Sequence, residues 1–388
     1  MDRTPRLLTR PFILAVLAEL GICLTIGMLL GTLPLYAKGP LDTGAVGVGL
    51  AVGSLSLTAV VFQPIAGRIG DRRGRKILVV AGSLIVACSV LAYTVADVLA
   101  VLVALRLMTG VGEALIFVGA ATIVTDLAPE ERRGEAISIY SLGLWGGLAI
   151  GPFLGELVLG DGRYDAVWLT AAGFAFAAAL FGLGLPETRP AHTGRPRSNR
   201  LLHPAAFRPG LVLVASVFGF AGFSAFVALY ARDLGLDGAG AAFLLFSLVV
   251  VAIRTLGRRI PDRLGPKRAS ATALVLLATG LMTIGLWNEP AGLYAGTVVF
   301  AAGQALAFPA LLMLAVTGTP ASERSSVVGT FTACADIGFA AGALALGGVA
   351  AVAGYESVFL AAALSSLAGA FLLARVPQGG PVRPAEAS

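Results

Sequence analysis

Charged residues are scarce in this sequence: Asp, Glu, Lys and Arg make up only 13% of its 388 residues. Soluble globular domains carry about 25% charged residues. The 57% share of apolar residues and the mean hydropathy of +0.88 exclude a soluble globule of this length. The composition therefore indicates a chain that lies in a lipid bilayer.

Residues that bind metals or form disulfides are also few. The two histidines, His192 and His203, fall in a polar connection in the middle of the chain. The three cysteines, Cys23, Cys88 and Cys334, are scattered through apolar stretches without a paired spacing. We therefore expect no metal site and no disulfide, with the cysteines packed as small apolar residues.

Motifs of energy-coupling enzymes are missing as well. The sequence has no Gly-x-x-x-x-Gly-Lys-Ser/Thr phosphate-binding loop and no cluster of His and Cys. An ATP-driven pump or a membrane hydrolase is therefore not indicated. We expect that the protein is not an enzyme, that it needs no cofactor, and that its net charge of +6 reflects membrane topology and not nucleic-acid binding.

Long apolar runs dominate what is present. A helix needs about 20 residues to cross about 30 Å of hydrocarbon. The runs predict an all-α membrane protein with twelve transmembrane helices, at residues 11–36, 44–66, 77–96, 98–125, 135–159, 166–185, 209–231, 238–257, 269–287, 290–317, 326–352 and 355–375.

The first six spans and the last six are related by an internal repeat. An offset of 191 residues pairs Gly112 with Gly303, Phe117 with Phe308, Pro129 with Pro320, Gly147 with Gly338, Gly151 with Gly342, and Tyr164 with Tyr355. Many secondary transporters are built from two such repeats. We predict two pseudo-symmetric six-helix bundles at 1–185 and 209–375, joined by a Pro- and Arg-rich linker at 186–208 and followed by a tail at 376–388.

The basic residues indicate the orientation. If the N-terminus is cytoplasmic, the connections on that side contain every Lys and Arg except five. These five are Lys38, Arg163 and Arg232 in loops on the other side, and Arg106 and Arg254 within spans. Because cytoplasmic loops are rich in Lys and Arg, we expect a multi-pass monomer in the cell membrane, in contact with lipid, with linker, tail and both termini in the cytoplasm.

A charged turn follows the second predicted span and has a weaker copy in the second half. The first copy comprises Gly67, Asp71, Arg72, Gly74, Arg75 and Lys76. The second comprises Gly257, Asp262, Arg263, Gly265 and Lys267, with one extra residue before the Asp and Pro266 in place of an Arg. Ordinary topology charges would explain the Arg and Lys residues but not the repeated Asp and Gly. Asp71 can face the positive end of a neighbouring helix, such as one beginning near Ser325.

These turns resemble the signature loop of the major facilitator superfamily, and the resemblance covers nearly the whole chain. Within that superfamily the twelve-span drug and sugar efflux group is the most similar. The resemblance implies alternating access by rocking of the two bundles. It also implies that both turns form a cytoplasmic gate, which latches the two halves together in the outward-open state.

Three acidic residues, Glu19, Glu113 and Asp336, lie well inside predicted spans. Glu113 shares a helix face with Arg106, seven residues earlier, and corresponds to Gln304 in the repeat. Charged groups inside a membrane usually face a cavity, and burial favours the protonated form of a carboxyl. We predict that the three acids couple transport to protons, with Arg106 and Gln304 tuning charge or contacting the substrate.

Each of these acids also has a structural alternative. Glu113 and Arg106 could form an ion pair that serves only packing. Asp336 could make a helix-to-helix hydrogen bond, and Glu19 could extend toward the membrane interface.

The fifth predicted span contains Gly147, Gly151, Pro152 and Gly155, which resemble the helix 5 motif of antiporters in this superfamily. This chain has Glu156 where the family usually has a second Gly. Export by antiport is therefore favoured, and the alternative is a motif that serves only close helix packing.

Aromatic residues recur at near-helical spacing in the seventh predicted span: Phe218, Phe223, Phe226 and Tyr230. They could line an apolar drug site, or they could face the lipid or the core.

These features support a proton-coupled exporter of a small, largely apolar compound such as a drug or metabolite. One alternative is a proton symporter that imports a sugar or an organic anion held by Arg106. A further alternative is a transport-inactive sensor or scaffold. We expect the partners to be protons, a small-molecule substrate and membrane lipid.

Overall fold

The computed structural model describes residues 7–129, 132–188, 203–256, 264–317, 319 and 324–375. Within these residues the chain is helical and contains no strand, which confirms the predicted all-α class. The first half consists of α1 (Arg10–Lys38), α2 (Ala45–Arg73), α3 (Lys76–Leu91) with the short 3-10 helix η1 (Ala92–Val95), α4 (Leu99–Leu127), α5 (Arg133–Leu159) and α6 (Tyr164–Leu183). The second half consists of α7 (Pro204–Asp233), α8 (Gly240–Leu256), α10 (Pro266–Leu286), α11 (Pro290–Val316) and α12 (Arg324–Ala374).

The last helix, α12, contains two membrane-spanning segments. Gly354 interrupts it with φ +82° and ψ 174°, a conformation that glycine adopts without steric penalty. Among the described residues, ten helices are long and apolar enough to cross a membrane, and α8 is a shorter apolar helix. With the segments of α12 (324–353 and 355–374) counted separately, the described chain has the twelve predicted apolar segments.

Helix α7 begins five residues before its predicted span. The seventh span is predicted from residue 209, whereas α7 begins at Pro204. Proline is favoured in the first helical turn, and the His203 Nδ1 atom accepts a hydrogen bond from the Ala205 N–H at 3.2 Å. The last five residues of the predicted linker, 204–208, are therefore helical.

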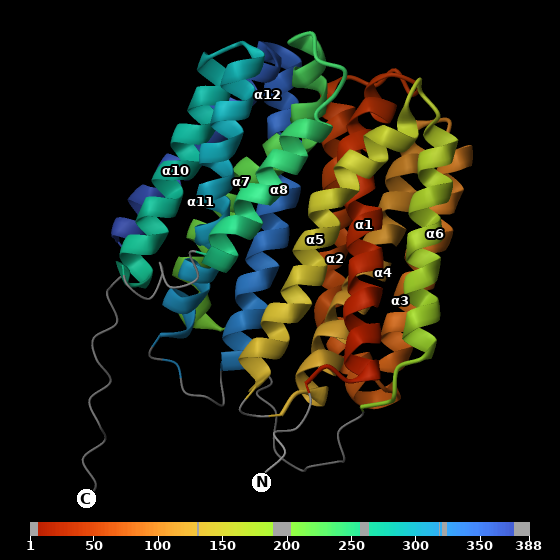
Figure 1. Ribbon diagram of the computed structural model, residues 1–388. Helices are drawn as coiled ribbons and strands as arrows, with labels where there is room; N and C mark the ends of the chain where they lie inside the picture. The colour runs from red at the N-terminus through yellow and green to blue at the C-terminus, as the bar shows by residue number, and fades with distance from the viewer. Residues whose placement is uncertain are drawn as a thin grey trace, which may run out of the picture.

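The helices form two groups (Figure 1). Helices α1 to α6, drawn from red to yellow-green, lie in one group, and α7 to α12, drawn from green to blue, lie in the other. Helix α5 packs on α8 and helix α2 packs on α12, so these pairs join the two groups.

Glycine contacts inside each group repeat with the offset found in the sequence. Two glycines of α5 pack against the backbone of α1, and the glycines 191 residues later pack against α7 at positions that are also 191 residues later. These pairs are Gly147 with Cys23, Gly151 with Gly27, Gly338 with Val214, and Gly342 with Phe218. A Cβ atom at any of these glycines would lie 2.5 to 2.8 Å from its partner. The internal repeat is therefore a repeat of contacts as well as of residues.

The helices share two ends, and the ends differ. We term the end at which α1 begins and at which Arg72 to Lys76 lie the basic end, and the other the opposite end. At the opposite end, α2 and the first segment of α12 pack closely across the two halves. A Cβ atom on Gly347 would lie 2.9 Å from the Ala45 carbonyl oxygen and 3.4 Å from the Gly49 Cα. Small residues let the two backbones approach.

Helices α5 and α8 meet on the other side of the same end. The Glu156 carboxylate accepts hydrogen bonds from the backbone N–H of Ala239 at 2.8 Å and of Gly240 at 2.6 Å, where α8 begins. At the offset of 191, Glu156 corresponds to Gly347, and Gly240 corresponds to Gly49. Corresponding positions of the repeat therefore join the halves on both sides of the opposite end. Gly347 packs against Gly49 on one side, and Glu156 caps α8 at Gly240 on the other.

Candidate functional site

The three predicted proton-coupling acids come from different helices. Glu19 lies in α1, Glu113 in α4 and Asp336 in the first segment of α12. Glu113 lies within electrostatic range of both Glu19 and Asp336. At about 1.5 Å per residue, all three lie about 14 to 21 Å from the basic end of their helices. The structure thus brings together, at mid-depth, acids from both halves.

Glu19 and Glu113 have few partners for their charges. The Glu19 side chain is buried, and its Oε1 atom accepts a 3.7 Å hydrogen bond from the Cys23 thiol. The Tyr140 hydroxyl is within reach of Glu19 but does not have the geometry of a formed hydrogen bond. The Oε2 atoms of Glu19 and Glu113 are buried and have no hydrogen-bond partner among the described residues. A buried carboxyl oxygen without a partner is costly in the interior of a membrane protein.

Asp336 forms a contact between the two halves. Its Oδ2 atom accepts a hydrogen bond from the Gln63 side-chain amide of α2 at 2.9 Å. This is the helix-to-helix hydrogen bond that the sequence allowed as an alternative. The carboxyl that holds this contact is also the one on which the charge of Glu113 acts.

Arg106 is fixed to α2 and does not form an ion pair with Glu113 among the described residues. Its Nε atom donates to the Ala51 carbonyl at 2.9 Å, and its Nη2 atom donates to the Val52 carbonyl at 3.2 Å. Arg106 still acts electrostatically on Glu113. Gln304, the repeat counterpart of Glu113, is buried in α11, and its Oε1 atom has no partner in the described chain.

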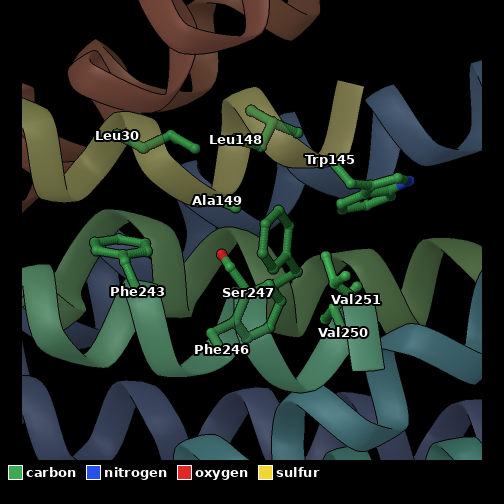
Figure 2. Close-up of a pocket in the computed structure, with 10 residues that line it drawn as sticks. Leu30, Trp145, Leu148, Ala149, Phe243, Phe246, Ser247, Val250 and Val251 are labelled. Atoms are coloured by element: carbon green, nitrogen blue, oxygen red, sulfur yellow. The ribbon is translucent and has the colours of Figure 1, made fainter. Parts of the chain in front are cut away.

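An apolar cavity lies between the two halves, where α1, α5, α7 and α8 meet (Figure 2). Its walls are Leu30, Trp145, Leu148, Ala149, Phe220, Phe243, Phe246, Ser247, Val250 and Val251. Figure 2 shows Leu148 and Trp145 on one wall, facing Phe243, Phe246 and Ser247 on the other. The cavity has a volume of about 20 Å³ and is therefore narrow in this state.

The aromatic stripe predicted in α7 does not form the wall of this cavity. Phe226 stacks on Tyr355 with ring centroids 6.0 Å apart, and the Tyr230 hydroxyl donates to the Ile284 carbonyl at 3.0 Å. Phe223 is fully buried among other aromatic rings, and the backbone of Phe218 packs against a glycine of α12.

The aromatic residues that do line the cavity are Phe220, Phe243, Phe246 and Trp145, which the sequence analysis did not single out. The three-residue spacing of Phe243 and Phe246 places both on one face of α8, and this spacing could have pointed to them.

The first charged turn is held by residues of its own half. The Arg75 guanidinium forms an ion pair with Asp126 at the end of α4 and approaches Asp71 at 4.0 Å. The Arg75 backbone N–H donates to the Glu187 carboxylate at 2.7 Å. Gly74 has φ +106° and ψ 159°, and a Cβ atom there would collide with Glu187. The described contacts of Arg75 therefore join α2 and α3 to the ends of α4 and α6.

The second charged turn is described only in part. Gly257, Asp262 and Arg263 lie outside the described residues, as does the side chain of Ser325. The Lys76 ammonium donates to the Leu183 carbonyl at 2.7 Å, and the Lys267 ammonium donates to the Ala374 carbonyl at 3.2 Å. The two donors are 191 residues apart, and so are the two acceptors. The two turns therefore make equivalent hydrogen bonds. A latch between the halves remains a prediction for Gly67, Asp71 and Arg72.

The glycines of the helix 5 motif face α1. Besides the contacts of Gly147 and Gly151, a Cβ atom on Gly155 would lie 2.7 Å from the Met28 carbonyl oxygen, and Pro152 packs against Gly27 and Gly31. The motif therefore builds the interior of the first half. The next residue, Glu156, bonds the start of α8.

Comparison with known proteins agrees with this architecture. The family model described as Major Facilitator Superfamily matches residues 15–287 and 238–388. The uncharacterized MFS-type transporter STM4428 of Salmonella typhimurium (strain LT2) is 31% identical over 358 residues, which cover 89% of this chain and 91% of that protein. The uncharacterized MFS-type transporter YhhS of Escherichia coli (strain K12) is 28% identical over 348 residues, which cover 88% of this chain and 86% of that protein.

Solved structures share the fold at low sequence identity. A bacterial homolog of the human lysosomal transporter Spinster, in an inward-facing and occupied conformation, matches with a TM-score of 0.79 at 13% identity, covering 93% of this chain and 95% of that one. The human organic anion transporter MFSD10 (TETRAN) matches with a TM-score of 0.71 at 22% identity, covering 94% and 99%. Family, relatives and fold agree, and the chain therefore belongs to the major facilitator superfamily and is a multi-pass membrane transporter.

Proposed function

We propose that this protein is a proton-coupled antiporter that exports a small, largely apolar compound, such as a drug or metabolite, by alternating access. It would act as a monomer in the cell membrane, with both termini in the cytoplasm. The observation that carries the proposal is the set of acids from both halves, Glu19, Glu113 and Asp336, at mid-depth in a protein whose halves enclose an apolar cavity.

The surroundings of the acids support proton coupling. A charge buried in a membrane protein is costly unless it is paired or wetted. Among the described residues no cation forms an ion pair with these carboxyls, and Arg106 donates to carbonyls of α2. Their protonation therefore depends on access to water. Since Asp336 also bonds Gln63 across the halves, a change in its protonation alters a contact that rocking must break.

The closed end of the molecule supports a state that loads its cargo from the cytoplasm. The halves are joined at the opposite end by Gly347 against α2 and by Glu156 against α8. In the predicted orientation this end is extracellular. The direction of export is supported by the resemblance of the Gly147 to Gly155 motif to that of antiporters. For the importing alternative, two Arg106 donors, Nε and Nη2, are bonded to α2, which leaves only Nη1, buried and without a partner among the described residues, to hold an anion.

Everted membrane vesicles test the proposal. We expect some members of a panel of apolar compounds to dissipate a respiration-driven pH gradient in vesicles that contain the protein. Glu113→Gln and Asp336→Asn should reduce this proton flux at least about tenfold, since each removes a titratable group. Asp97→Asn, an exposed acid, serves as the matched control. The proposal would be wrong if no compound moved protons, or if a transported compound did so equally well in the double variant.

A further inference from the structure

Arg254 lies beside the apolar cavity and is held in an unusual way. It is in the last turn of α8, and its guanidinium carbon lies 4.0 Å from the centroid of the Trp145 ring in α5. Trp145, Val250 and Val251 line the cavity. Because Val250 and Val251 precede Arg254 by four and three residues, the three share one face of α8. The guanidinium therefore lies at the edge of the cavity, between the two halves.

The hydrogen-bond donors of Arg254 are open along one edge. Its Nε and Nη2 atoms are both buried and have no hydrogen-bond partner among the described residues. A guanidinium that stacks on an aromatic ring keeps its N–H groups in its own plane, free to bond outward. Nε and Nη2 lie on the same edge of the group, and their two parallel N–H bonds match the two oxygens of a carboxylate.

Comparison with the corresponding site of the internal repeat shows that Arg254 lacks a carboxylate partner from the repeat position of Asp336. The residue 191 positions before Arg254 is Gln63, and the residue 191 positions before Asp336 is Trp145. The pair Gln63–Asp336 on the α2 side of the interface therefore corresponds to the pair Arg254–Trp145 on the α8 side. On the first side the amide donor meets a carboxylate of the protein. On the second side the donor is a cation, and the position of the carboxylate is taken by an indole.

We propose that the Nε and Nη2 edge of Arg254 binds the carboxylate of an amphipathic organic anion, whose apolar body enters the cavity among Trp145, Phe243 and Phe246. This inference rests on the proposed function, because it takes the cavity to be part of the transport pathway. It narrows the cargo from largely apolar compounds to those that also carry one carboxylate. Since the cavity is narrow here, α5 and α8 must separate to admit the cargo.

Equilibrium binding without a proton gradient tests this site independently of transport. The purified protein is placed in nanodiscs of zwitterionic lipid, so that anionic headgroups do not compete. Two isosteric probes, 4-(trifluoromethyl)benzoate and 4-(trifluoromethyl)benzamide, are titrated and followed by fluorine NMR line width, with empty nanodiscs as the blank. We expect the wild type to bind the carboxylate about tenfold or more tightly than the amide, because bonds to a charged donor pair are strong.

Variants assign the preference to Arg254. Arg254→Gln, which installs the residue of the corresponding position 63, should bring the ratio of the two affinities close to one while the amide still binds. Arg268→Gln, which removes an exposed charge in the same half, should leave the ratio unchanged. Equal affinities in the wild type, or a preference that survives in Arg254→Gln, would overturn the proposal. The proposal would also be overturned if the wild type showed no preference for the carboxylate and Asp262→Asn created one. Asp262 would then be the group that neutralises the guanidinium in the wild type. Failure of proton coupling in vesicles leaves this binding result unaffected.

Discussion

Single residues decide the geometry of the first charged turn. Gly74 adopts φ +106° and ψ 159°, a region that is essentially restricted to glycine, and the Glu187 carboxylate occupies the place of a Cβ atom. Gly67, in the same motif, is different, because a Cβ atom there would meet no atom within 4 Å. Steric constraints therefore require glycine at position 74 but not at position 67.

Alanine substitutions separate the two glycines. We expect Gly74→Ala to lower the stability of the purified protein by about 1 to 3 kcal/mol, the usual strain of such a backbone conformation. Gly67→Ala should leave stability unchanged or raise it slightly, since it lies inside α2. Thermal unfolding in detergent measures both. Equal midpoints for the two variants would contradict the assignment of strain to Gly74.

Among the helices, α8 depends on a residue from the other half. Its first backbone N–H groups have no partner in their own helix. Glu156 of α5 supplies both carboxylate oxygens to Ala239 and Gly240. A negative group at a helix N-terminus is also favoured by the helix dipole. The start of α8 is therefore a contact between halves, in a helix of only 17 residues.

Removing this cap should loosen α8 locally. In Glu156→Ala we expect amide hydrogens near residues 239–243 to exchange at least about tenfold faster, since a hydrogen bond to a charged acceptor contributes about 1.5 to 3 kcal/mol. Glu289→Ala, an exposed acid at the same end, should not change exchange there. Mass spectrometry of peptic peptides gives both rates, and unchanged exchange in Glu156→Ala would show that the cap contributes little.

The composition and the repeat were sufficient to predict the architecture of the whole molecule. The apolar runs predict twelve helical segments, and the described residues contain them once α12 is divided at Gly354. The acids Glu19, Glu113 and Asp336 lie at mid-depth, and their part in proton coupling stays a prediction. Contacts between the halves could not be predicted, because Gln63 and Asp336, or Trp145 and Arg254, meet only once the two bundles have packed. Of the two alternatives for the aromatic residues of α7, packing in the core is the one observed for Phe223, Phe226 and Tyr230. That Phe220 lines the cavity could not be predicted, because it depends on how its ring packs on Phe246 of α8.

Rocking of the two halves should be sensitive to bulk at the opposite end. Gly347 packs on α2, whereas a Cβ atom on its neighbour Gly348 would meet no atom within 4 Å. We expect Gly347→Leu to prevent closure of this end and so to abolish transport. In a protein that also carries Leu30→Cys, it should raise the labelling of residue 30 by an impermeant maleimide added from the opposite end. Gly348→Leu is the matched control and should behave as the wild type. Full transport by the folded Gly347→Leu protein would contradict the role of this contact.

The turn at Gly354 is the shortest of several short connections at the opposite end. It joins two spans through a single residue, and the other connections at the opposite end, 39–44, 96–98, 160–163, 234–239 and 287–289, are at most six residues long. The connections at the opposite end are therefore poor sites for protease cleavage, antibody binding or insertion of an affinity tag. Fusion partners and crystallisation chaperones should be directed to the basic end, where the longer connections lie.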